Sequence, residues 1–183
     1  MTSSNDSRPA AHIRRARPSD SKAIFEVTRV AFQNHPYSEG KEQYLCEALL
    51  SANALTLSLI AEVNGEVVGH VAFSPVTIAD GSVGWLGMGP LSVSPEFQRQ
   101  GIGSSLVREG LSMMEAIGAR GCVVLGDPAY YRGFGFRNDP RLTLEGVAAE
   151  HFQAISFAEG EAAGEVKFHP VFYAEYRCLA SDS

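Results

Sequence analysis

The pattern of apolar and polar residues between positions 85 and 136 predicts a strand, a turn, a helix and a second strand. Residues 85–93 form an apolar run, and residues 104–117 place apolar side chains on one face at helical spacing. That face consists of Leu106, Val107, Gly110, Leu111, Met114 and Ile117. Gly118 follows where a helix C-cap is expected, and residues 122–125 are typical of a short buried strand. The segment is therefore predicted to be a βαβ unit.

The turn that precedes this helix has the sequence QRQGIG, from Gln98 to Gly103. Two closely spaced glycines allow the backbone to bend so that several N–H groups point at one spot. The first N–H groups of a helix have no intrahelical partner, and the helix dipole adds partial positive charge there. We therefore expect the N–H groups between Arg99 and Ser104 to bind a phosphate or a pyrophosphate.

The glycine pair by itself also fits a plain strand-to-helix turn. A Rossmann fingerprint would need a third glycine where Leu106 stands, and an acidic residue where Val123 and its apolar neighbours lie. A P-loop would need a Gly-Lys-Ser or Gly-Lys-Thr tripeptide, which the chain lacks. The spacing alone leaves open a structural turn and a phosphate site.

The residues before this unit predict a strand, two helices and a hairpin. The expected elements are a strand at 12–17, a helix after Pro18, a second helix at 39–50, and strands at 55–63 and 66–74. Ser19 or Asp20 is expected to be the N-cap of the first helix. Asn64 and Gly65 join the two later strands and form a strong hairpin signal.

The residues after the unit predict a short helix and further strands. Asp127 is expected to cap a helix that begins at Pro128. This places Tyr130 and Tyr131 at the carboxyl end of strand 122–125, where ligands collect in α/β sheets. The remaining expected elements are a strand at 142–144, a helix at 148–157, and one or two strands within 165–176.

Composition and charge exclude several classes of protein. The 183 residues suit one domain, and a formal net charge of −6 disfavours a nucleic acid or an anionic membrane as partner. The three cysteines, Cys46, Cys122 and Cys178, match neither a disulfide framework nor a zinc site, and we expect no metal. No apolar run reaches the roughly 18 residues of a membrane span. The expectation is a cytoplasmic protein with a disordered tail at 1–9 and a single domain at 10–183.

Two motifs carry a resemblance to a known family. The spacing Gln98-x-x-Gly101-x-Gly103 resembles the acyl-CoA pyrophosphate loop of the GNAT superfamily of N-acetyltransferases. The spacing Tyr131-x-x-x-Gly135-Phe136, after the next strand, resembles a second segment of that superfamily. The motifs occur in the expected order, and the amino-acid sequence around them is similar to that of a predicted-acetyltransferase subgroup of unknown substrate. The resemblance covers residues 13–136 at least.

The resemblance implies an α/β fold with a mixed, mostly antiparallel sheet flanked by helices. In that fold the fourth strand, here 85–93, carries a bulge and splays from the fifth, here 122–125. Pro90 agrees with this, because proline inside a strand indicates a bulge, an edge or an end of pairing. The gap between the two strands admits the pantetheine arm of the cofactor, which hydrogen-bonds the exposed strand backbone.

The resemblance also implies an acetyl-CoA-dependent N-acetyltransferase acting by direct attack in a ternary complex with a small-molecule or peptide amine. It makes Tyr131 the catalytic residue that protonates the leaving thiolate. The residues expected to bind acetyl-CoA are Leu91, Ser92, Val93, Gln98, Arg99, Gln100, Gly101, Ile102, Gly103, Ser104, Asp127 and Tyr130. The sequence is compatible with a homodimer. A non-catalytic acyl-CoA-binding or sensing module, and a nucleotide-phosphate binder, are the alternatives.

The sequence does not identify a general base. Residues 85–93 contain no Asp or Glu, although some superfamily members place a carboxylate on this strand. The loop after the first helix, which helps to form the acceptor side in the family, contains His35, Tyr37 and Glu39. For these three residues, and for His70 in the strand at 66–74, an ordinary structural role is the competing interpretation.

Overall fold

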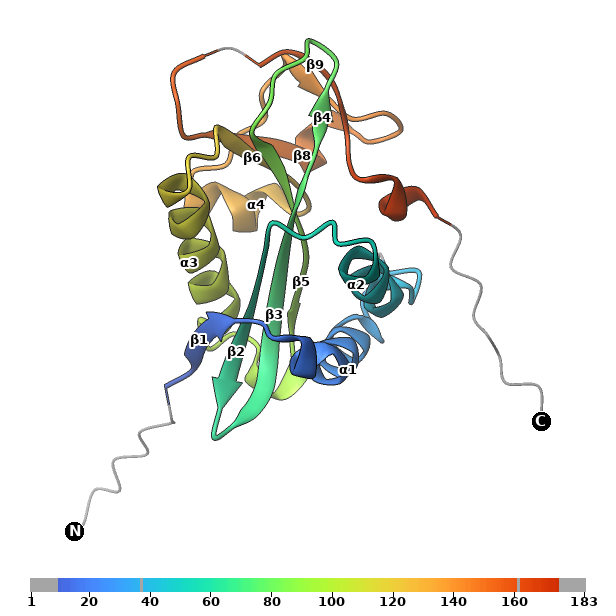
Figure 1. Ribbon diagram of the computed structural model, residues 1–183, viewed down its shortest axis with the longest axis vertical. Coiled ribbons are helices and arrows are strands. Elements are labelled where there is room, and N and C mark those ends of the chain that lie inside the picture. Colours follow the sequence, from blue (N-terminus) through green and yellow to red (C-terminus); the bar gives the residue numbers. More distant parts are fainter. Residues whose placement is uncertain (1–9, 37, 161, 175–183) are drawn as a thin grey trace.

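The computed structural model describes residues 10–36, 38–160 and 162–174, and they form a six-stranded sheet flanked by helices. The strand order is β1-β2-β3-β5-β6-β8, and only the β5–β6 pair is parallel. Figure 1 shows α3 on one side of the sheet and α1 and α2 on the other. The predicted mixed, mostly antiparallel sheet between helices is confirmed.

The elements have the following bounds. The large sheet contains β1 (His12–Arg15), β2 (Leu57–Val63), β3 (Glu66–Pro75), β5 (Trp85–Val93), β6 (Gly121–Leu125) and β8 (Phe152–Ser156). The α-helices are α1 (Ser21–Phe32), α2 (Glu42–Ser51), α3 (Ile102–Ala116) and α4 (Pro128–Tyr131). Short 3₁₀ helices lie at η1 (Pro18–Asp20), η2 (Pro95–Phe97), η3 (Arg132–Phe134), η4 (Ala149–His151) and η5 (Pro170–Tyr173). A small sheet joins β4 (Thr77–Ile78), β9 (Gly164–Lys167) and β7 (Leu142–Thr143).

Local turn chemistry fixes several boundaries as predicted. Asn64 and Gly65 both have positive φ and connect β2 to β3 in a hairpin. Gly118, with φ of 86°, follows the end of α3, and the N–H of Ala119 donates to Met114 O at 3.0 Å. The helix itself begins at Ile102, two residues before the predicted start. Glycine suits positive φ because it has no β-carbon, and asparagine tolerates it because its short polar side chain can form hydrogen bonds locally.

The helix predicted at 148–157 is wrong. Only Ala149–His151 forms a 3₁₀ turn, and Phe152–Ser156 is strand β8, paired antiparallel with β6. Phe152, Gln153 and Ala154 are buried, so the segment gains more from covering the edge of β6 than from its local helical preference. The segment predicted as strands within 165–176 forms β9 and η5, and its last two residues lie outside the described part of the chain.

The N-terminal helices also differ from the prediction. The second helix begins at Glu42 instead of Glu39. Asp20 does occupy the N-cap position of α1, but its carboxylate accepts from the Arg14 guanidinium at 2.8 and 3.0 Å and from the Arg17 N–H. The Arg14 partner lowers the pKa of Asp20 to about 2. This carboxylate ties the start of α1 to strand β1.

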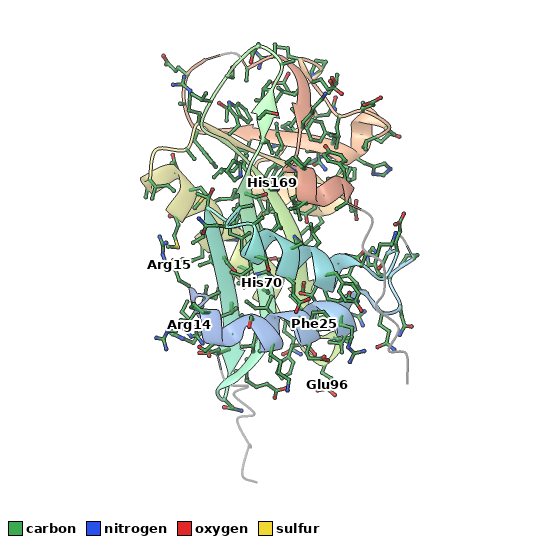
Figure 2. All side chains as sticks on the ribbon, turned by 45° about the vertical axis from the view of Figure 1, so that its right-hand side comes forward. Arg14, Arg15, Phe25, His70, Glu96 and His169 are labelled. Carbon is green, nitrogen blue, oxygen red and sulfur yellow. The ribbon has the colours of Figure 1, made fainter. Side chains whose placement is uncertain are left out.

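The interior contains a buried histidine. His70 of β3 is 1% exposed and lies toward the middle of the molecule in Figure 2, where α1 and α2 cover the sheet. Its Nε2 lies 2.9 Å from Ser58 Oγ, and its Nδ1 lies 3.9 Å from Cys46 Sγ. Burial lowers the pKa of His70 from its ordinary 6.5 to about 4, so the ring is neutral at pH 7.

Acidification should therefore destabilise the fold through His70. At a pH between these two pKa values, His70 is protonated in the unfolded chain and neutral in the folded chain. The contribution of the neutral ring to the free energy of unfolding is therefore full above pH 6.5 and is lost as the pH falls toward 4. The full shift corresponds to about 3 kcal/mol. Urea unfolding of the wild type and of His70→Gln, which has no titrating ring, should give a stability difference that shrinks between about pH 7 and pH 5. A difference that does not change with pH would contradict this assignment.

Candidate active site

The candidate site is the gap that begins where β5 and β6 stop pairing. The two strands pair in parallel only from Trp85–Met88 to Gly121–Val124, whereas β5 runs on to Val93 with β3 as its partner on the other side. The predicted splay of these strands is thus present. The register with β3 shifts at Gly89 and Pro90, which form the bulge that the proline predicted.

The backbone of Leu91 and Val93 faces this gap. The Ser94 N–H donates to Val68 O of β3 at 2.9 Å, and Ser92 lies opposite His70 in the β3–β5 register. Because the polar groups of successive residues alternate between the two edges of a strand, Leu91 and Val93 direct theirs away from β3. Val93 O agrees with this, since it accepts from Gln98 Nε2 at 2.9 Å. This edge of β5 offers hydrogen bonds to an extended ligand.

The helix that follows begins with free donors. Arg99 and Gly101 have φ of 57° and 85°, and this left-handed pair turns the chain from η2 into α3. The Ser105 N–H makes the first intrahelical bond, to Gly101 O at 2.9 Å. The N–H groups of residues 102–104 therefore have no intrahelical partner, and they lie at the positive end of the helix dipole. An anionic group fits this end.

The side chains of the turn stabilise the loop itself. Gln98 bonds back to β5, as described, and Gln100 Nε2 donates to Glu96 O at 2.8 Å. Figure 2 shows Glu96 at one end of the molecule, beyond Phe25 of α1. The two amides thus hold the turn against the end of β5 and against η2.

Tyr130 meets the start of α3. A Cβ atom placed on Gly103 would lie 3.0 Å from Tyr130 Oη, so a glycine at this position leaves room for the phenol. Gly103 thus belongs to the helix and not to the bend, unlike the prediction that both glycines form the turn. Burial raises the pKa of Tyr130, and a hydrogen bond with the Ser104 side chain opposes this effect. No signal in the sequence predicts this contact between α4 and the start of α3.

Tyr131 lies at the carboxyl end of β6. Asp127 caps α4 as predicted, because its Oδ1 accepts from the Ala129 N–H at 2.8 Å. The Tyr131 ring packs against Gly126 and edge-on to Phe136, with ring centroids 5.8 Å apart. Burial raises the pKa of Tyr131 above its ordinary value, so its phenol is protonated at neutral pH. The residue can donate a proton or a hydrogen bond there.

Other candidate residues contact neighbouring residues of the fold. Ser92 turns its backbone to β3 and its hydroxyl to α1, where Ser92 Oγ donates to Thr28 Oγ1 at 3.0 Å. The His35 ring packs on Phe32 at 5.7 Å, and Glu39 pairs with Lys41 at 3.1 Å. Tyr37 lies outside the described residues. The prediction of Ser92 as a cofactor contact is thus not matched by an orientation toward the gap.

A cavity of about 430 Å³ lies elsewhere, near the outer edge of β8. Its lining includes Trp85 and Ser156, which belong to one end of the β5–β6–β8 pairing, whereas the gap opens at the other end, beyond Met88 and Val124. The cavity is therefore separate from the gap. Among residues 10–36, 38–160 and 162–174, no group of three or more His, Cys, Asp or Glu side chains could hold a metal ion. No helix in the part of the chain described here is long and apolar enough to cross a membrane.

Comparison with known proteins agrees with this geometry. Residues 21–136 match the model of the Acetyltransferase (GNAT) family. The uncharacterized N-acetyltransferase YhbS of Escherichia coli is 38% identical over 163 residues, which cover 85% of this chain and 94% of that protein. The chain therefore belongs to the GNAT family of acetyltransferases.

Two solved structures have the same fold. A GNAT family acetyltransferase from Brucella melitensis, in complex with acetyl-CoA, is 46% identical with a TM-score of 0.80, over 89% of this chain and 98% of that one. Escherichia coli YhbS in complex with CoA is 33% identical in the structural alignment, with a TM-score of 0.84, over 93% of this chain and 97% of that one. The fold and the family predicted from the two motifs are confirmed.

Proposed function

We propose that this protein transfers the acetyl group of acetyl-CoA to a primary amine by direct attack within a ternary complex. The observation that carries the proposal is the continuity of one segment, residues 89–104. It supplies an unpaired strand edge and, a few residues later, a helix start with free N–H groups. The relatives from Brucella melitensis and Escherichia coli that hold acetyl-CoA and CoA support the same assignment.

Each part of the cofactor has a matching element. The pyrophosphate binds the N–H groups from Arg99 to Ser104, where the helix dipole favours a negative charge. The pantetheine arm contains amides, and it pairs with the gap-facing backbone of Leu91 and Val93 as an added strand would. The Tyr130 phenol, beside the start of α3, borders the pyrophosphate site. This arrangement directs the thioester toward the carboxyl end of β6.

The reaction forms a C–N bond and breaks the C–S bond of the thioester. A lysine-like amine has a pKa of about 10.4, so it must lose a proton before it attacks. A backbone N–H of the β5 edge stabilises the oxyanion of the tetrahedral intermediate. Tyr131 then gives its proton to the thiolate of CoA, and the tyrosinate regains a proton, by way of water, from the nitrogen as the amide forms. For the proton lost before the attack, β5 contains no carboxylate to act as base. We infer that the proton of the amine leaves through water.

The glycine turn provides a direct test of the donor site. Gly101 and Gly81 both have φ near 84°, and neither has a neighbouring atom where a Cβ would lie. Gly101→Val and Gly81→Val should therefore lose similar stability, about 1–2 kcal/mol each. Only Gly101→Val should also place a side chain in the space of the phosphates, and weaken acetyl-CoA binding by about tenfold or more.

Calorimetric titration with acetyl-CoA, CoA, NAD and ATP measures this difference. The wild type should bind acetyl-CoA and CoA, and not NAD or ATP. Wild-type preference for NAD or ATP would make the turn a nucleotide site. Equal affinity in Gly101→Val and Gly81→Val would remove the pyrophosphate from this turn.

Replacement of the two tyrosines separates binding from chemistry. Tyr131→Phe should lower kcat by about tenfold to a hundredfold with little change in the KM for acetyl-CoA, because it removes only the proton donor. Tyr130→Phe should instead raise that KM with kcat nearly unchanged. A panel of amines, assayed by release of the free thiol of CoA, supplies the substrate for both measurements. A wild type that binds acetyl-CoA but turns over no amine would be a binding module, and an unchanged kcat in Tyr131→Phe would exclude this residue as the acid.

A further inference from the structure

Beyond Met88, β5 is held on one side only, by its ladder with β3. After Met88 the strand has no β6 partner, and the bulge at Gly89 and Pro90 separates residues 91–93 from the regular part of the strand. A strand with one neighbour is less restrained against twisting than a strand paired on both sides, and such twisting would rotate the N–H and C=O groups of Leu91 and Val93. Contacts on a face of the strand add to the β3 ladder in fixing their direction.

One such contact is a buried hydroxyl pair. Ser92 Oγ donates to Thr28 Oγ1 of α1 at 3.0 Å, and the two residues are 1% and 0% exposed. Ser92 lies between the two residues whose backbone faces the gap. A hydrogen bond from this side chain to the helix on the face of the sheet opposes rotation of residues 91–93 about the strand axis.

Thr28 is itself held by further buried groups. Thr28 Oγ1 lies 3.8 Å from Cys46 Sγ of α2, and Cys46 Sγ lies 3.9 Å from His70 Nδ1, whose other nitrogen meets Ser58. Burial raises the pKa of Cys46 to about 12, so the thiol stays protonated. Contacts to sulfur are long and weak. The strongest hydrogen bond near the gap in this series of buried side chains is therefore the one between Ser92 and Thr28.

We propose that Ser92 and Thr28 are positioning residues for the acyl-CoA, and this rests on the proposed function. Their hydroxyl pair holds the gap-facing backbone of Leu91 and Val93 in the direction that the amides of pantetheine require. Neither hydroxyl touches the cofactor. A purely structural pair, in contrast, would contribute to stability and leave ligand recognition unchanged.

The test compares two ligands that differ in the pantetheine arm. Acetyl-CoA uses the strand edge and the helix start, whereas adenosine 3′-phosphate 5′-diphosphate carries the pyrophosphate without the arm. Thr28→Val keeps the shape of the side chain and removes the hydroxyl. It should weaken acetyl-CoA binding by ~5- to 20-fold and binding of the diphosphate by less than about twofold. Thr28→Ser, which keeps the hydroxyl, should restore the acetyl-CoA affinity.

Two further variants make the result decisive. Ser92→Ala should reproduce the selective loss, and the double variant Ser92→Ala with Thr28→Val should lose no more than either single one. Ser58 is the member of this series of buried contacts that lies farthest from Ser92. The variant Ser58→Ala should therefore bind both ligands as the wild type does. Equal losses for the two ligands, or a lowered Tm with unchanged acetyl-CoA affinity, would overturn the positioning role alone. A wild type that binds the diphosphate but not acetyl-CoA would overturn the proposed function with it.

Discussion

The break in pairing between β5 and β6 is the constraint on which the site depends. Backbone N–H and C=O groups inside a protein need partners, and each one left without a partner costs about 1–3 kcal/mol. Residues Leu91 and Val93 leave such groups at an edge where the neighbouring strand has departed. The Gln98 amide donates to Val93 O, and the other groups face the gap, where the proposed pantetheine arm would take the place of the missing strand. The end of the pairing thus leaves an edge to which an extended ligand can form hydrogen bonds.

The covalent continuity of the chain then places this edge close to the start of α3. Only eight residues separate Val93 from Ile102, and η2 with the left-handed residues Arg99 and Gly101 directs them into α3. The strand edge and the helix start therefore cannot shift independently by much. The proposed cofactor, with amides in its pantetheine arm and a pyrophosphate beyond them, carries its polar groups in the same order. In that proposal one run of the sequence binds both parts.

Local signals in the sequence predicted much of this arrangement, and contacts between distant segments account for the rest. Asn64-Gly65, Gly118 and the Asp127–Pro128 cap act within a few residues, so their consequences are readable from the chain. Strand β8 was not predicted because its burial against β6 outweighs the local preference of this segment for a helix. The approach of Tyr130 to Gly103 joins two helices, and the Ser92–Thr28 bond joins residues 64 positions apart. Neither contact leaves a trace in local spacing.

The two adjacent tyrosines of the short helix α4 pack against different parts of the protein. Successive residues of a helix point about 100° apart, so Tyr130 reaches the start of α3 while Tyr131 packs on Gly126 and Phe136. Gly135, with φ of 99°, turns the chain so that Phe136 enters the core with no exposed surface. In the Tyr-x-x-x-Gly-Phe segment, buried Phe136 fixes the backbone to the core. The packing of the Tyr131 ring against Phe136 then holds its phenol at the end of β6.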